Sequence, residues 1–184
     1  MATVFIPETQ ETLKEATDIK TYLEKIKIGF EQWSPNHPLA EDASEADILS
    51  AYEEDLAPLK ASGGYVHADV INIDAKTPNL DVMLNKFNKE HSHDEDEVRF
   101  TLAGHGLFHI NPVNSPVVAV EVEAGDLLLV PKGTLHWFDL CGDRTITAIR
   151  LFQDTTGWTP HYTESELEQQ FQPLCFGSTF VSKK

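Results

Sequence analysis

The chain has 184 residues, of which 41% are hydrophobic, and its formal net charge is −16. This length suits one domain, and the apolar content can build a buried core, which excludes an intrinsically disordered chain. The negative charge repels phosphate backbones and anionic lipid surfaces, so we expect no nucleic-acid partner and no membrane partner.

We expect a cytoplasmic monomer. The N-terminal sequence MATVFIPETQ lacks the basic start and apolar run of a secretory signal, and no long apolar edge strand stands out as a contact between copies. Cys141 and Cys175 are too few and too far apart for a disulfide framework or a cysteine-rich metal site. Free thiols in a reducing compartment are therefore expected.

The region 1–64 is predicted to be helical, because its apolar residues recur every three or four positions. The first apolar stripe comprises Leu13, Ala16, Ile19, Leu23 and Ile26. A second helix is expected to begin after Ser44, a favourable N-cap residue. Its stripe comprises Ile48, Leu49, Tyr52 and Leu56. Pro58 and the Gly63–Gly64 pair are expected to close this region.

Between residues 65 and 160, short runs rich in Val, Ile and Phe alternate with turn signals. The runs are YVHADVINI, DVMLNKF, EVRFTL, GLFHI, VVAVEV, DLLLVP, LHWFDL and TITAIRLF. They predict eight strands of an all-β sandwich or barrel, with AGHG at 103–106 as a hairpin turn. In the tail, 161–184, TESELEQQF predicts one short helix.

Two segments contain candidate metal ligands. Residues two apart in a strand face the same side, so His91, His93, Glu97 and Arg99 share one face if the strand persists. His136 follows a Pro-x-Gly turn in VPKGTLHWF. If the two segments are neighbouring strands, His136 completes a set of three histidines and one carboxylate.

Such a set suits first-row metals such as Fe, Ni, Cu and Zn, and the lack of a thiolate disfavours a structural zinc site. It leaves two positions open on an octahedral ion, which a chelating substrate can occupy. The alternative is a solvated acidic loop, since EHSHDEDEVRF contains five acids. The remaining histidines lack a partner at a ligand spacing and are expected to be structural or exposed: His37, His67, His105, His109 and His161.

These segments resemble the two cupin motifs. The run HSHDEDE at 91–97 with Gly104 is similar to the first motif, and the run at 125–136 is similar to the second. Asn85 and Leu140 depart from the general pattern, which often has Gly and Asn there, but neither position is a metal ligand. The resemblance implies a mainly β protein, a cupin double-stranded β-helix barrel.

A closer resemblance is to the acireductone dioxygenase family. It is carried by KFNKEHSHDEDEVRF, VPKGTLHWFDL and AIRLFQDTTGW, with FEQW near residue 30 and GGYVHADVI at 63–71. It runs through most of the chain and implies one cupin domain over 1–184. In this domain, N-terminal helices (1–64) precede the barrel (65–160), and a tail with a short helix (161–184) follows it.

The family resemblance implies a methionine-salvage enzyme that cleaves the acireductone 1,2-dihydroxy-3-keto-5-methylthiopentene with O₂. With Fe(2+) the expected products are formate and 2-keto-4-methylthiobutyrate. With Ni(2+) they are formate, carbon monoxide and 3-methylthiopropionate. One ion per chain would be held by His91, His93, Glu97 and His136. Arg99 would stabilise the substrate dianion, and the alternative for Arg99 is a surface ion pair.

Other roles are less determined by the sequence. The resemblance places Glu90 and Asp96 behind the ligands, with Glu90 in metal loading, and the alternative is that both are solvated acids. Phe87 and Phe138 match substrate-wall positions or belong to the core. Arg150 lies in the apolar run TAIRLF and needs an internal partner, such as Asp96 or a substrate oxygen, or must point outward.

Two other classes of protein share the cupin motifs. One is a cupin enzyme with another chelating substrate, such as a sugar isomerase or a decarboxylase. Such enzymes are not expected to carry EVRF, HWFDL and AIRLF at these places. The other is a non-catalytic cupin that binds metal or a small ligand, and four intact candidate ligands with Arg99 argue against it.

Overall fold

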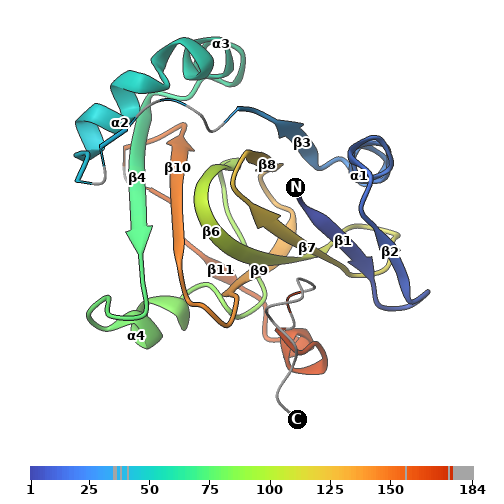
Figure 1. Cartoon of the computed structure of the whole chain (residues 1–184). Coiled ribbons are helices and arrows are strands. Elements are labelled where there is room, and N and C mark those ends of the chain that lie inside the picture. Colours follow the sequence, from blue (N-terminus) through green and yellow to red (C-terminus); the bar gives the residue numbers. More distant parts are fainter. Residues whose placement is uncertain (35–36, 38, 41, 156, 174, 176–184) are drawn as a thin grey trace.

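The structure is a computed structural model that describes residues 1–34, 37, 39–40, 42–155, 157–173 and 175 (Figure 1). Its helices are α1 (Ala16–Lys25), α2 (Glu45–Ala51), α3 (Glu53–Gly63), α4 (Leu80–Leu84) and the 3₁₀ helix η1 (Leu167–Gln170). Its strands are β1 (Thr3–Ile6), β2 (Glu11–Leu13), β3 (Gly29–Gln32), β4 (His67–Ile73), β5 (His91–Ser92), β6 (Glu97–Asn111), β7 (Val118–Glu123), β8 (Asp126–Val130), β9 (Leu135–Leu140), β10 (Ile146–Phe152) and β11 (His161–Tyr162).

The strands are antiparallel and form the mainly β barrel that the sequence predicts, with β6 as its shared strand. The first half of β6 lies between β10 and β8. Its second half lies between β7 and β9. In Figure 1, β6 curves through the centre, with β4 and β10 on one side and β7 with β1 on the other. Because β6 belongs to both sheets, it joins them into one barrel.

The predicted hairpin at 103–106 is wrong, because β6 runs through it as one strand of 15 residues. Gly104 has a φ of 73° there, and the pairing with β10 shifts so that Leu102 is skipped between Thr101 and Ala103. A β-bulge of this kind bends a strand without ending it. The glycine signal therefore marks the bend between two sheets.

The interior of the barrel is apolar. Residues of both sheets meet in one cluster that includes Val4, Phe108, Ile110, Val120, Leu128 and Ile146. Helix α1 covers this cluster with Ile19 and Leu23, both 0% exposed, as its apolar stripe predicts. The barrel is thus a packed core, and the functional groups lie at one end of it.

The N-terminal region is only partly helical. Ser44 caps α2 as predicted, and its hydroxyl and the Asp47 carboxylate form a reciprocal capping box. However, β1, β2 and β3 also lie within residues 1–64. Strand β1 has alternating burial and pairs with β7, a tertiary contact that local periodicity does not show. Pro58 lies within α3 and does not close it.

Two further short segments differ in detail from the prediction. DVMLNKF is not a strand, because its first residues form α4. A short apolar run fits either structure, and the αL conformation of Asn79 begins a helical turn here. The helix predicted in the tail is present as the single 3₁₀ turn η1. In the part of the chain that the structure describes, no helix has the length and apolar character needed to cross a membrane.

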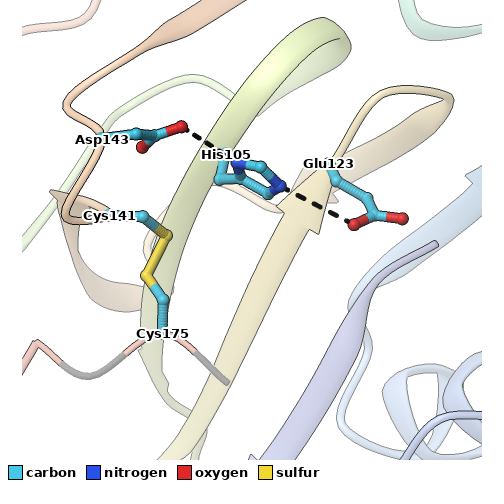
Figure 2. Close-up of a disulfide and its surroundings, with 5 residues drawn as sticks. All are labelled: His105, Glu123, Cys141, Asp143 and Cys175. Carbon is cyan, nitrogen blue, oxygen red and sulfur yellow. Dashed lines mark hydrogen bonds and ion pairs between the residues drawn. A yellow bond between two sulfur atoms is a disulfide. The ribbon is translucent and has the colours of Figure 1, made fainter. Parts of the chain in front are cut away.

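The expectation of two free thiols is wrong. Cys141 and Cys175 form a disulfide, with their Cα atoms 5.7 Å apart, although they are 34 positions apart in the sequence (Figure 2). Cys141 comes directly after β9, and the C-terminal part of the chain returns to the same sheet. Distance along the sequence therefore does not describe the distance between these two residues in the fold.

Replacement of Gly104 by alanine should destabilise the protein by about 2–4 kcal/mol, because the new Cβ adds a steric clash to a positive φ. That Cβ would lie 2.0 Å from the Thr145 carbonyl oxygen. Gly64→Ala is the matched control, since Gly64 has a φ of 69° but no atom within 4 Å of the added Cβ. It should cost only about 1 kcal/mol. Urea unfolding of both variants measures the difference, and equal losses would contradict the steric explanation.

Candidate metal centre

Four buried side chains converge at one end of the barrel. His91 in β5 lies directly opposite His136 in β9. Glu97 begins β6, and His93 lies between β5 and β6. The nearest ligand atoms of all four lie within 4.8 Å of one another, and each residue is 1–3% exposed. The structure thus brings together the four residues that the sequence motifs single out.

The strand that carries these residues does not persist, although the sequence argument assumes that it does. The chain bends at residues 94–95 between β5 and β6. The Glu95 carboxylate fixes this bend by accepting hydrogen bonds from the backbone N–H groups of Gln153 and Asp154, at 2.9 and 3.1 Å. The shared face therefore results from a bent segment that is fastened to the end of β10.

Each histidine is oriented by a backbone carbonyl. Nδ1 of His91 donates to the Lys89 oxygen at 2.6 Å, and Nδ1 of His136 donates to the Thr134 oxygen at 2.8 Å. Nδ1 of His93 donates to the Thr159 oxygen at 3.0 Å. A carbonyl oxygen can only accept, so Nδ1 carries the hydrogen and Nε2 of the neutral ring presents a lone pair. All three Nε2 atoms face the interior cluster.

The cluster fits a bound metal ion. Oε2 of Glu97 lies 3.1 Å from Nε2 of both His93 and His136. Nε2 of His91 and of His93 is buried and has no hydrogen-bond partner among the residues that the structure describes. Lone pairs that face a carboxylate repel it unless a cation lies among them. Metal bonds of about 2.1 Å at right angles place ligand atoms about 3.0 Å apart, close to the observed spacing.

Burial and neighbouring charges keep His91 and Glu97 unprotonated. Burial lowers the pKa of His91 to about 4, with a further contribution from His136. Burial alone would raise the pKa of Glu97, but the charge of Arg99 outweighs it, with a further contribution from the neighbouring His136 and His93, and holds that pKa well below its usual range. Metal ligands must be free of protons, so these two residues are ready to bind metal at neutral pH.

Arg99 lies beside the cluster and not on the surface, so the alternative of a surface ion pair is excluded. It is 4% exposed, and its Nε lies 2.7 Å from Oε1 of Glu97. The contact is an ion pair, and Nε of Arg99 makes no hydrogen bond within the described residues. The guanidinium lies over the Phe138 ring at 4.4 Å and over the rings of Phe108 and Trp158 at 5.3 Å. Packing therefore fixes a positive charge next to the metal ligands.

Arg150 is the cross-strand neighbour of Arg99. Its partner inside the fold is Asp69 of β4 and not Asp96. The Asp69 carboxylate accepts two hydrogen bonds from Arg150, at 2.8 and 2.5 Å. A contact of Arg150 with a substrate oxygen stays a prediction. Arg150 also lies 5.4 Å from the Trp158 ring centroid. Two arginines thus lie side by side, each with one carboxylate.

The aromatic candidates occupy different places. Phe87 packs against His91, with ring centroids 5.9 Å apart, and lines a pocket of about 290 Å³ with Asp69, Arg150 and Trp158. Phe138 is a core residue, 3% exposed, and also the platform beneath Arg99. The core alternative is therefore confirmed for Phe138, and its role as a substrate wall stays a prediction.

The two acids behind the ligands are not simply solvated. Glu90 is 2% exposed, and its carboxylate accepts hydrogen bonds from Asn111, Thr163 and Ser165. These bonds outweigh the effect of burial and lower the pKa of Glu90. Asp96 accepts from the Tyr65 hydroxyl at 3.2 Å and from the backbone N–H of Lys132 at 2.9 Å. Both acids fasten neighbouring segments to the ligand strand.

The remaining histidines lie outside this cluster. His105 is in β6 and not at an exposed turn, and Figure 2 shows it between Asp143 and Glu123, at 3.1 and 3.9 Å. His109 is buried and stacks on Trp137, with ring centroids 4.9 Å apart. The others lie towards the surface, where His37 and His161 pair with Asp55 and Asp94.

Sequence reasoning missed the residues that support the cluster from a distance. Asp69 lies 81 positions from Arg150, and the Thr159 carbonyl lies 66 positions from His93. Trp158 occurs in the segment AIRLFQDTTGW, where no local pattern indicates its role. A carbonyl carries no side-chain signal, so only the fold could reveal the contact of Thr159.

A β-barrel that holds three histidines and one glutamate at one end is characteristic of the cupin metalloproteins. The model of the ARD/ARD' family matches residues 2–160. An acireductone dioxygenase from Picosynechococcus sp. is 47% identical over 174 residues, which cover 95% of this chain and 99% of that protein. One from Bacillus cereus is 38% identical over 171 residues, which cover 88% of this chain and 100% of that protein.

A solved structure gives the same result. Acireductone dioxygenase from Bacillus anthracis, with a cadmium ion in its active centre, superposes with a TM-score of 0.81 at 36% identity. The match covers 88% of this chain and 98% of that chain. This chain belongs to the acireductone dioxygenase family.

His136→Ala should remove most of the bound metal while the fold persists, because one of four ligands is lost at the end of a packed barrel. Metal content after loading with Ni(2+) and gel filtration measures the loss, and far-ultraviolet circular dichroism checks the fold. The matched control is His105→Ala, which removes a histidine outside the cluster and should leave the metal content unchanged. Equal metal content in wild type and His136→Ala would contradict the site.

His109 should make the protein less stable in mild acid. Burial lowers its pKa to about 4, so between pH 6.5 and 4 the unfolded chain takes up a proton that the folded chain does not. Stability is therefore lost as pH falls through this range, by up to about 3 kcal/mol. His109→Phe keeps the stacking on Trp137 and should flatten the profile of unfolding free energy against pH in metal-free protein. Parallel profiles for wild type and variant would refute this assignment.

Proposed function

We propose that this protein is a metal-dependent acireductone dioxygenase of methionine salvage, which cleaves 1,2-dihydroxy-3-keto-5-methylthiopentene with O₂. The observation that supports this most directly is the buried cluster of three imidazoles and one carboxylate beside two arginines. A chelating, doubly ionised enediol needs both a metal and nearby positive charge. Membership of the family and the cadmium site named for the Bacillus anthracis relative support the same conclusion.

We assign the ligand roles to His91, His93, Glu97 and His136, with one Fe(2+) or Ni(2+) ion per chain. Imidazole and carboxylate accept both metals, and intrinsic affinity favours Ni(2+). With Fe(2+) the products are formate and 2-keto-4-methylthiobutyrate. With Ni(2+) they are formate, carbon monoxide and 3-methylthiopropionate. The metal that the cell supplies then decides the products.

The bound metal supplies Lewis-acid stabilisation of the ionised enediol. The electrons for O₂ come from the substrate itself, so the protein has to bind and orient an electron-rich dianion. Arg99 performs this task, because its guanidinium is fixed over Phe138 and is buried next to the ligands. A charge that is already oriented needs no reorganisation when the dianion forms.

The pocket beside the cluster selects and shields the substrate. Phe87 and Trp158 give it apolar walls, and Arg150 adds a second positive charge that Asp69 holds in place. The two rings displace water on their side of the pocket, which strengthens the electrostatic contacts next to them. Glu90 and Asp96 act indirectly, because they fasten neighbouring segments around the ligands.

We further propose that the chain is one domain and acts as a cytoplasmic monomer on a small-molecule substrate and O₂. The net charge of −16 argues against nucleic-acid and membrane partners. The shared strand β6, which pairs with both sheets, supports one continuous barrel.

Oxygen uptake by Fe(2+)-loaded protein with freshly generated acireductone tests this function. We expect fast uptake above the uncatalysed oxidation, with formate and the 2-keto acid identified by mass spectrometry. Reloading with Ni(2+) should yield carbon monoxide. No uptake above background, with metal content confirmed, would leave a metal-binding cupin without this activity.

The same assay with Arg99→Lys measures the contribution of the guanidinium group to catalysis. Lysine keeps the charge but not the planar group fixed over Phe138, so kcat/KM should fall by roughly 100-fold with the metal retained. Arg144→Lys is the matched control, since Arg144 is 41% exposed and pairs with Asp81 away from the cluster. A normal kcat/KM in Arg99→Lys would remove Arg99 from the mechanism.

A further inference from the structure

The C-terminal segment, defined as residues 157–173 with Cys175, crosses the metal centre before it reaches the disulfide. Trp158 stacks near His93, with ring centroids 6.0 Å apart. The Thr159 carbonyl accepts the hydrogen bond from Nδ1 of His93 at 3.0 Å. Strand β11 then pairs with β5, where Tyr162 is opposite His91. Two of the three histidines are therefore in direct contact with this segment.

The middle of the segment is fastened through Glu90, the residue before His91. The hydroxyl groups of Thr163 and Ser165 each donate to Oε2 of Glu90 at 2.5 Å. The backbone N–H of Thr163 donates to the Glu90 carbonyl oxygen at 3.0 Å. Charge-assisted hydrogen bonds of this length are strong when they are buried. Movement of this part of the segment would therefore disturb the backbone beside a metal ligand.

The far end of the segment is held by a covalent bond. Phe171 packs on Trp137 of β9, with ring centroids 5.6 Å apart. Cys175 is bonded to Cys141, which follows β9 by one residue (Figure 2). Both cysteines are buried, at 1% and 7% exposed. The segment is thus clamped between β5 and the end of β9, and each of these strands carries one of the histidines.

We propose that the Cys141–Cys175 disulfide is a redox-sensitive clamp that holds the C-terminal segment against the ligand strands and slows release of the catalytic metal. The proposal rests on the metal ligands assigned above, but not on the reaction that they catalyse. In it, Thr159, Thr163 and Ser165 are positioning residues, and the disulfide keeps them in place.

The switch consists of one two-electron step. A thiol or phosphine reductant supplies two electrons, the sulfur–sulfur bond breaks, and each sulfur takes up one proton. With a phosphine, the reductant becomes the phosphine oxide and its oxygen comes from water. The metal keeps its oxidation state throughout.

Loss of the cross-link should affect metal release through local opening. A metal ion leaves when the histidines swing away, which requires β5 and β11 to separate briefly. Such openings are rarer when a segment is tied at both ends, because its contacts then re-form within one tethered chain. Without the disulfide, the end of the segment can detach from β9 and the opening becomes more frequent.

Release of Ni(2+) to an excess of a chromogenic chelator tests the clamp without substrate or O₂. Oxidised wild type is compared with protein treated with a phosphine, which is chosen because dithiols bind Ni(2+) themselves, and mass spectrometry confirms the thiol state. We expect release to be roughly threefold faster or more after reduction. Cys175→Ser should release Ni(2+) as fast as reduced wild type and should not respond to the phosphine.

Two control variants separate clamping from general stability. Leu56→Ala creates a cavity beneath α3, in a hydrophobic cluster that contains none of the four ligands, so it should lower the melting temperature without faster release. Thr163→Val removes one hydrogen bond to Glu90 and should speed release in oxidised protein.

Equal release rates in oxidised wild type and Cys175→Ser would overturn the clamp, even if the enzyme is active. Fast release from Leu56→Ala would overturn it too, since the effect would then follow global stability. A wild-type protein that takes up no Ni(2+) would instead overturn the ligand assignment on which the proposal rests.

Discussion

A buried carboxylate that faces the lone pairs of three imidazoles is stable only when a positive charge lies among them. The other features of this end of the barrel depend on that constraint. Backbone carbonyls of Lys89, Thr159 and Thr134 hold the hydrogen on Nδ1 of each ring. They therefore prevent the rings from turning a donor towards Glu97. Hydrogen bonds to the backbone thus set the ring orientation that a metal site requires.

The same constraint explains the two arginines. Glu97 interacts with Arg99 as well as with the histidines, so its single negative charge attracts both the guanidinium and a metal bound by the histidines. Asp69 balances Arg150. Among Glu97, Asp69, Arg99, Arg150 and a divalent metal, positive charge would exceed negative charge, although the acids behind the ligands are negative and the whole chain carries −16. The pocket can then attract an anion that the rest of the surface repels.

The sequence predicts well the features that depend on local spacing. The histidine spacing and the Pro-x-Gly turn predict the four clustered residues, and Ser44 predicts the start of α2. The prediction from sequence fails where a contact between residues far apart in the chain determines the structure. AGHG predicts a turn, but pairing with β10 and β9 keeps β6 continuous. The disulfide and the Arg150–Asp69 pair join residues 34 and 81 positions apart, so no local pattern could show them.

The position of the ligands also links metal binding to folding. His91 and His136 meet only because β5 pairs with β9, and His93 keeps its orientation only while residue 159 lies against it. In an unfolded chain His136 is far from the other three ligands, so the chain binds metal weakly. A ligand that binds only the folded state stabilises it by mass action. Metal thus acts on the fold as a long-range cross-link, and the Cys141–Cys175 disulfide acts on the same segments from the opposite end of β9.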